Sequence, residues 1–172
     1  NKIRGINMIN KLPKIELHCH LDGSVRVDTI IDIAKKENIK LESYEKCDVE
    51  KLVQVPNDCT SLNEYLKRFD LANKVMQSRE NIKRVTFELL EDAQKENVKY
   101  IEVRFAPLLH LNGGLSIEEV IQSAIDGINE AEKMYDIKGN IILCCMRTMS
   151  EDDAILVVEE GKKFLNKGVV AI

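Results

Sequence analysis

The chain has 172 residues, of which 44% are hydrophobic and 31% are charged, and its formal net charge is −4. This length suffices for one domain with a sizeable core, and an acidic balance without a basic cluster argues against nucleic-acid binding. No apolar run approaches the roughly 20 residues of a membrane span, the first ten residues lack a signal-peptide core, and five cysteines without a C-x-x-C motif favour reduced thiols in the cytoplasm.

The hydrophobic pattern predicts strands that alternate with helices. In chain order we expect a strand at 14–20, a helix at 27–38, helices at 61–77 and 79–96, a strand at 99–105, a helix at 116–135, a strand at 140–146, a helix from 150 to about 166 and a strand at 169–172. Capping-box spacings begin at Ser61 and Ser116. Strands separated by helices pair in parallel with right-handed crossovers, so the sequence predicts an α/β fold.

The first two predicted strands each have one polar face. Alternation along the first strand places four ionisable side chains together, Glu16, His18, His20 and Asp22. The second strand repeats the pattern with Glu102 and Arg104. Parallel strands are usually apolar on both faces, so a polar face indicates the lumen of a barrel; an exposed sheet face is the alternative. We expect Glu16, Glu102 and Arg104 to be structural charges that line the lumen and have partners there.

His18 and His20 form a potential metal-binding pair. Positions two apart on a strand project from the same face, so both imidazoles can reach one ion while Cys19 points to the other face. Imidazole nitrogen is a common ligand for Zn²⁺ and related metals. Two unrelated histidines in a loop are the alternative interpretation.

Four strands in 172 residues are half of a (β/α)₈ barrel, which typically needs about 250 residues. The last predicted strand stops in mid-run at Ile172, and the chain starts on Asn1 and not on methionine. We therefore expect residues 1–172 to be a partial TIM-barrel hydrolase domain, the N-terminal half of a larger enzyme truncated at the fourth strand.

Residues 12–24, Leu-Pro-Lys-Ile-Glu-Leu-His-Cys-His-Leu-Asp-Gly-Ser, resemble the first-strand signature of the adenosine deaminase family, metal-dependent members of the amidohydrolase superfamily. Further blocks agree with that family in order and spacing, at residues 61–70, 100–107, 142–147 and 169–172. The first block is highly specific and the others support it, so the resemblance spans nearly the whole chain.

The resemblance implies roles for several residues. His18 and His20 would be two of the ligands of one zinc ion, and His20 and Asp22 would bind the substrate, Asp22 through the ribose of a nucleoside. An apolar pocket gate would comprise Leu62, Tyr65, Leu66 and Phe69, for which a plain amphipathic core helix is the alternative. The remaining metal ligands, the glutamate general acid and a water-steering histidine are expected beyond Ile172, so we expect no catalytic residue within the chain. His110 follows the second strand and is expected to be exposed to solvent.

The implied function is zinc-dependent hydrolytic deamination of adenosine or 2′-deoxyadenosine to inosine or 2′-deoxyinosine and ammonia. In that chemistry a zinc-bound water attacks C6 of the purine and a carboxylic acid protonates the ring. With two of the ligands present, we expect weak or absent zinc binding and no turnover by this fragment alone. The expected partner is a small purine nucleoside, with no nucleic acid and no membrane, and open sheet edges predict self-association.

Two other functions stay open on the sequence. A sister deaminase that acts on free adenine is similar, although that group tends to carry Glu where this chain has Asp22. A non-catalytic half domain that serves in binding or assembly is the second alternative.

Overall fold

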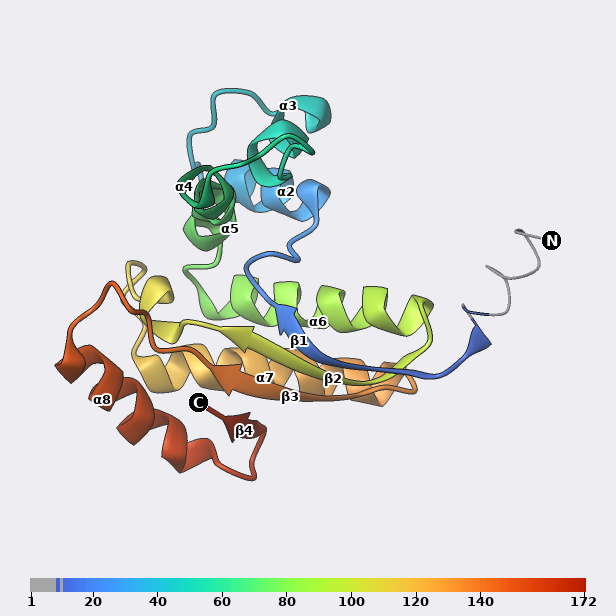
Figure 1. The fold of residues 1–172 in the computed structure, drawn as a ribbon, viewed down its shortest axis with the longest axis vertical. Coiled ribbons are helices and arrows are strands. Elements are labelled where there is room, and N and C mark those ends of the chain that lie inside the picture. The colour runs from blue at the N-terminus through green and yellow to red at the C-terminus, as the bar shows by residue number, and fades with distance from the viewer. Residues whose placement is uncertain (1–8, 10) are drawn as a thin grey trace.

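The computed structural model describes residue 9 and residues 11–172, which form a parallel sheet covered by helices (Figure 1). The strands are β1 (Lys14–His20), β2 (Val98–Phe105), β3 (Lys138–Leu143) and β4 (Val169–Ala171). They are neighbours in the order β1-β2-β3-β4, and every pair is parallel. The predicted α/β class and the order of the strands are therefore confirmed.

The helices largely follow the predicted positions. The α-helices are α2 (Val27–Lys36), α3 (Lys46–Val53), α4 (Leu62–Leu66), α5 (Asp70–Val75), α6 (Arg79–Lys95), α7 (Ile117–Met134) and α8 (Glu151–Gly161). Three short 3₁₀ helices are η1 (Lys67–Phe69), η2 (Pro107–His110) and η3 (Lys162–Phe164). The single helix predicted over 61–77 is wrong in detail, because η1 divides it. The helix α3 was not predicted; it buries only Val49, which leaves little apolar periodicity to detect.

N-terminal caps fix several helix starts. At Ser116 the full capping box is present, since the Ser116 hydroxyl accepts from the Glu119 N–H and the Glu119 carboxylate accepts from the Ser116 N–H. At Ser61 only half of the predicted box forms, because the Ser61 hydroxyl accepts from the Glu64 N–H at 3.5 Å without the reciprocal bond among the described contacts. The weaker cap accords with the short helix α4 that follows it.

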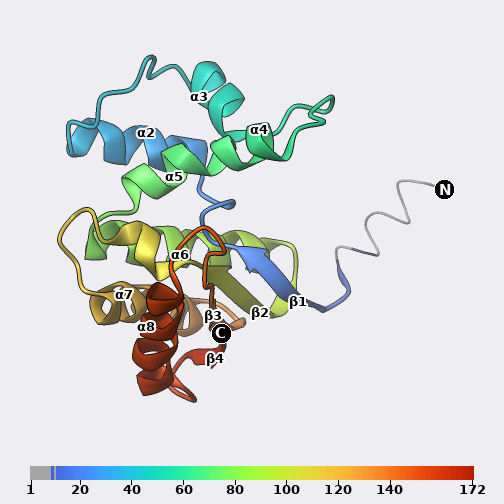
Figure 2. The same cartoon turned by 60° about the vertical axis from the view of Figure 1, so that its left-hand side comes forward.

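The helices α6 and α7 support the sheet, as Figure 2 shows. A side chain at Gly127 of α7 would place its Cβ 2.4 Å from the carbonyl oxygen of Lys83 in α6, so the two helices pack at close range. Their buried aliphatic side chains meet those of β2 and β3, including Ile101, Val103 and Ile141. Burial of this apolar surface is the main stabilising contribution to the domain.

No helix within the described residues is long and apolar enough to cross a membrane.

The helices α2, α3, α4 and α5 form a separate group at the end of the molecule where β1 ends (Figures 1 and 2). In this group α2 buries Ile30 and Ile33, and α5 buries Ala72 and Val75. The chain enters the group directly from the carboxyl end of β1. The fold therefore brings the residues after His20 against the predicted gate.

The polar face of β1 differs from the prediction. Glu16 pairs with Ile101 and Cys19 with Val103, so β1 holds one residue more than β2 between these pairs, which is a β-bulge. The Glu16 carboxylate accepts a hydrogen bond from the backbone N–H of His18 at 2.8 Å. The row of four polar side chains is thus interrupted at the bulge, and Glu16 satisfies a backbone donor of its own strand. The apolar face is also less covered than expected, since Ile15 and Leu17 are 69% and 55% exposed.

The polar face of β2 agrees with the prediction of partnered structural charges. The Tyr100 hydroxyl donates to the Glu102 carboxylate at 2.8 Å and accepts from the Asn140 amide of β3 at 3.1 Å. These polar groups lie partly buried on the face opposite Ile101 and Val103.

The third strand is shorter than predicted, because β3 ends at Leu143 and the segment that follows leaves the sheet.

Candidate active site

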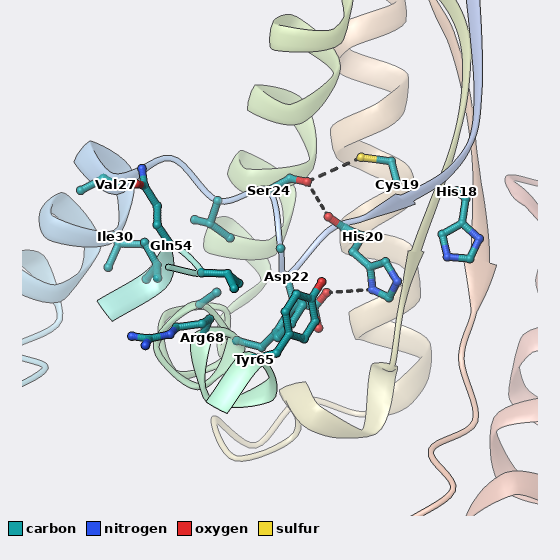
Figure 3. Close-up of a pocket in the computed structure, with 16 residues that line it drawn as sticks. His18, Cys19, His20, Asp22, Ser24, Val27, Ile30, Gln54, Tyr65 and Arg68 are labelled. Carbon is teal, nitrogen blue, oxygen red and sulfur yellow. Dashed lines mark hydrogen bonds and ion pairs between the residues drawn. The ribbon is translucent and has the colours of Figure 1, made fainter. Parts of the chain in front are cut away.

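His18 and His20 lie side by side at the carboxyl end of β1. Their ring centroids are 5.5 Å apart with the rings inclined at 51°, and both rings line a cavity of about 470 Å³ (Figure 3). The predicted proximity of the two imidazoles is therefore present. Cys19 points away, where its Sγ lies 3.6 Å from the Ser24 hydroxyl and the side chain packs against the core.

Asp22 lies beside this pair. Its carboxylate is 3.6 Å from Nδ1 of His20, and its side chain is only 12% exposed. Burial raises the pKa of Asp22 above its ordinary value, while the neighbouring His20 acts in the opposite direction. The oxygen Oδ1 is buried without a hydrogen-bond partner among the described residues. A buried acceptor of this kind is suited to a hydroxyl donor on a ligand.

The turn after β1 presents these groups. Leu21 is fully buried and its N–H donates to the carbonyl of Arg104 at 3.0 Å, while the Ser24 hydroxyl donates to the carbonyl of His20 at 2.6 Å. Gly23 lies against the gate, since a Cβ there would be 3.1 Å from the ring of Phe69. The chain therefore leaves the sheet in a turn that is fixed on both sides of Asp22.

The predicted gate residues differ in how they meet the site. Phe69 lies 6.1 Å from the ring of His20 and 5.6 Å from that of Tyr65, and it lines both this cavity and a second one. Tyr65 lines the first cavity and Leu66 the second. Leu62 lines neither and is 70% exposed. The amphipathic core helix considered as the alternative does not occur, because α4 and η1 bury no residue.

The second cavity, of about 550 Å³, shares His20, Asp22 and Phe69 with the first. Its other walls come from the carboxyl ends of β2 and β3, including Phe105, Ala106, Cys144, Met146 and Arg147. Sequence reasoning did not place the last three at the site. Their position directly after a parallel strand was the available signal, because ligands of α/β barrels bind at the carboxyl ends of the strands.

Arg104 connects the histidine pair to β3. Its guanidinium lies 3.2 and 3.3 Å from the two ring nitrogens of His18 and donates through two nitrogens to Sγ of Cys144 at 3.3 Å. An Arg N–H always donates, so the unprotonated ring nitrogen of His18 is the acceptor. Arg104 is the lumen-facing charge that was predicted, and its partners are a candidate metal ligand and a thiol.

The prediction of an exposed His110 is wrong. His110 ends η2, is 1% exposed, and its Nδ1 donates to the carbonyl of Met76 at 3.0 Å. Burial lowers its pKa to about 4, so the imidazole is neutral at physiological pH. The apolar residues around it in sequence, Leu108, Leu109 and Leu111, were the signal that this segment turns back into the core.

The donor set suits a borderline metal only in part. Two imidazoles at the mouth of a cavity match two positions of a tetrahedral zinc site, and catalytic zinc usually has three protein ligands. Within the described residues, no group of three or more His, Cys, Asp or Glu side chains could hold an ion. Among the described residues, His18 and His20 supply two imidazole donors at this cavity, which is fewer than a catalytic zinc site usually has.

The chain is similar in sequence to the proteins of one known family. A family model described as adenosine deaminase matches residues 13–172. Proteins named adenosine deaminase from Clostridium botulinum (strain Kyoto / Type A2) and Clostridium perfringens (strain ATCC 13124) are 65% identical over 162 residues and 60% identical over 167 residues. These alignments cover 94% and 97% of this chain but 48% and 50% of the relatives. The chain spans about half the length of the curated relatives it matches.

Solved structures with similar folds include two from Arabidopsis. The complex of ADAL with IMP has a TM-score of 0.79 at 29% identity and the N6-mAMP deaminase MAPDA has 0.79 at 31% identity; each covers 95% of this chain, and this chain covers 49% and 50% of them. A Zn-bound cog1816 amidohydrolase from Burkhoderia ambifaria has a TM-score of 0.82 at 23% identity, with coverage of 96% and 44%, and shares the fold. The predicted N-terminal half of a TIM-type barrel is confirmed.

Proposed function

Because the chain belongs to the adenosine deaminase family, we propose that the intact protein converts adenosine and 2′-deoxyadenosine to inosine and 2′-deoxyinosine with release of ammonia. The observation that carries this proposal is the histidine pair at the carboxyl end of β1 with Asp22 beside it in the same cavity. Residues 1–172 would form the first half of the catalytic barrel domain.

His18 and His20 would hold one zinc ion through their imidazole nitrogens. A bound ion would supply an activated water with a pKa of about 7, so that hydroxide would be available at neutral pH. Arg104 lies 3.2 and 3.3 Å from the ring nitrogens of His18 and is held by Cys144, so it would have to release the acceptor nitrogen of that ring when the imidazole binds an ion.

Asp22 and His20 would bind the nucleoside. The buried carboxylate of Asp22 can accept hydrogen bonds from sugar hydroxyls, and its unpartnered Oδ1 supports that role. The aromatic and apolar walls, with Phe69 and Phe105, suit a planar purine. Leu62, Tyr65, Leu66 and Phe69 would form the gate, with Phe69 nearest to the reacting centre.

The relatives are about twice as long as this chain, and we propose that the general acid and the other metal ligands come from the part that the chain does not cover. Residues 1–172 alone would then not turn over and would hold zinc weakly or not at all. The proposed substrate is a small purine nucleoside, and the proposed compartment is the cytoplasm.

A direct assay tests the proposal. The intact protein, purified with its metal, should deaminate adenosine with release of ammonia, lose that activity with a zinc chelator, and regain it when Zn²⁺ is restored. His18→Ala and His20→Ala should each abolish activity and reduce bound zinc. An intact, zinc-loaded protein that releases no ammonia from adenosine or 2′-deoxyadenosine would overturn the assignment.

A further inference from the structure

The gate segment, which we define as residues 62–75 (α4, η1 and α5), is bonded at its carboxyl end to the segment that follows β2. Met76 comes directly after α5, and its carbonyl oxygen accepts a hydrogen bond from Nδ1 of His110 at 3.0 Å. Gln77 donates from Nε2 to the carbonyl of Leu109 at 2.9 Å. We call Met76 and Gln77 the hinge. One of the two bonds has its donor in η2 and the other has its donor in the hinge, and together they hold the hinge against η2.

Burial makes the bond of His110 costly to lose. The imidazole is 1% exposed and lies 5.6 Å from the ring of Phe105, which leaves water no access to it. Since the Met76 carbonyl can only accept, the proton of the neutral ring resides on Nδ1. If the bond broke, a buried donor and a buried acceptor would both be left unpaired.

The loop after η2 packs against the hinge as well. A Cβ at Gly113 would lie 2.0 Å from the carbonyl oxygen of Gln77, an approach that only glycine permits. The hinge therefore contacts both η2 and the backbone of Gly113.

Apart from the hinge, the gate segment is bonded to another element through Arg68, whose guanidinium donates to the carbonyl of Lys51 in α3 at 2.7 Å. No residue of α4 or η1 is buried, and in α5 only Ala72 and Val75 are. Tyr65 and Phe69 thus lie on a segment whose position is set from its α5 end and by the bond of Arg68 to α3. The partner of the hinge, η2, continues directly from the pocket wall, because Phe105, Ala106 and Leu109 line the second cavity with Phe69.

We propose that His110 and Gln77 are positioning residues that fix the hinge of the gate segment to the carboxyl end of β2 and so hold Phe69 over His20. Neither residue touches the reacting centre; each acts through the gate. The effect on substrate rests on the proposed deaminase function, whereas the effect on the hinge depends only on the bonds described above.

The test compares variants of the intact protein. His110→Leu and Gln77→Leu remove the two donors from opposite sides, and His110→Asn keeps an N–H donor near the position of Nδ1. Thr86→Val is the matched control, because the Thr86 hydroxyl makes a buried hydrogen bond to the Ile82 carbonyl inside α6, away from the gate. Hydrogen exchange of residues 62–75 and the separate values of KM and kcat for adenosine are measured.

In His110→Leu, exchange at residues 62–75 should rise by roughly fivefold or more relative to Thr86→Val, as expected for the loss of one buried hydrogen bond. Gln77→Leu should have an effect of at least that size, because Nε2 of Gln77 donates to the carbonyl of Asn73 at 2.6 Å as well as to that of Leu109. KM should rise by a similar factor while kcat changes less, and His110→Asn should restore both. If His110→Leu does not fold, Gln77→Leu decides, since its side chain is only partly buried.

Exchange and KM equal to those of Thr86→Val would overturn the proposal. Faster exchange in a protein that deaminates no nucleoside would refute the proposed function and leave the hinge assignment supported.

Discussion

The carboxylate of Asp22 lies 3.6 Å from Nδ1 of His20, and the two side chains line both cavities of the candidate site. A candidate metal ligand and a candidate substrate-binding group are thus adjacent, two residues apart in the turn that leaves β1. This adjacency allows the two roles to be separated by substitution at one position.

Replacing Asp22 by Ala in the intact protein should lower kcat/KM for adenosine by roughly 10-fold or more, as expected for loss of a charged hydrogen-bond partner at ~1.5–3 kcal/mol. Asp22→Asn, which keeps the shape and one acceptor, should lose less. The loss on free adenine should be smaller, because the base has no sugar hydroxyl to donate. Zinc content serves as the control and should not change; equal losses on both substrates would assign Asp22 to the metal site or to the fold.

Removing an imidazole should affect metal binding selectively. Residues 1–172 alone should bind Zn²⁺ weakly or not measurably in a calorimetric titration, because His18 and His20 supply only two ligands. In the intact protein His18→Ala or His20→Ala should reduce bound zinc, measured by elemental analysis. The third histidine gives the control, since His110→Asn should retain zinc. A chain of 172 residues that binds one zinc tightly within a single copy would contradict this prediction.

Protonation of His110 should destabilise the fold in acid. Its pKa is about 4 in the folded chain and about 6.5 when unfolded, so between these values the unfolded state binds more protons. Stability is therefore fully present above about pH 6.5 and is lost as the pH falls towards 4, by about 3 kcal/mol. Urea unfolding of the wild type and of His110→Asn at several pH values isolates this contribution. Parallel pH profiles for the two proteins would show that His110 does not titrate in this window.

Two gate positions should respond differently to truncation. Phe69 lines both cavities and lies 6.1 Å from the ring of His20, whereas Leu62 lines neither and is 70% exposed. In the intact protein Phe69→Ala should raise KM for adenosine by about 10-fold or more, since burying an aromatic side chain against a ligand contributes about 1.5–3 kcal/mol. Leu62→Ala should stay within about twofold. The prediction fails if Leu62→Ala costs as much as Phe69→Ala.

The sheet edges should promote association of residues 1–172. In the described sheet β1 and β4 each have one neighbour, and unpaired strand edges recruit other strands. Light scattering at rising concentration should show dimers or larger species. Val170→Lys in β4 should shift them towards monomer, while Val158→Lys on the exposed face of α8 should not. A monomer at every concentration would refute edge pairing.

The parts of the fold that follow from local patterns were predictable. β1 was predicted at its observed bounds, and α6 and α7 end within one residue of the expected positions, because long amphipathic periods and capping residues are encoded locally. The break at η1 and the early end of β3 depend on packing between distant segments. Periodicity within a window cannot report such contacts.

At the site, the residues of β1 were predictable because a His-x-His pair on a strand fixes its own geometry. The position of His110 was not, since it depends on the carbonyl of Met76, 34 residues earlier in the chain. Met146 and Arg147 likewise enter the site only because β3 lies beside β2.

The bulge in β1 makes the chemistry of the strand sensitive to length as well as to composition. Between Glu16 and Cys19 the strand carries one residue beyond what pairing with β2 requires, and His18 lies within that surplus. Deleting Leu17 would remove that extra residue and leave both histidines in the sequence, yet every residue before the deletion would change the face of the sheet from which it projects. The opposite shift between Lys14 and Ile15, where β2 holds the extra residue, would then be uncompensated. A strand shortened by one residue could thus keep both histidines and still lose the arrangement that presents them to the cavity.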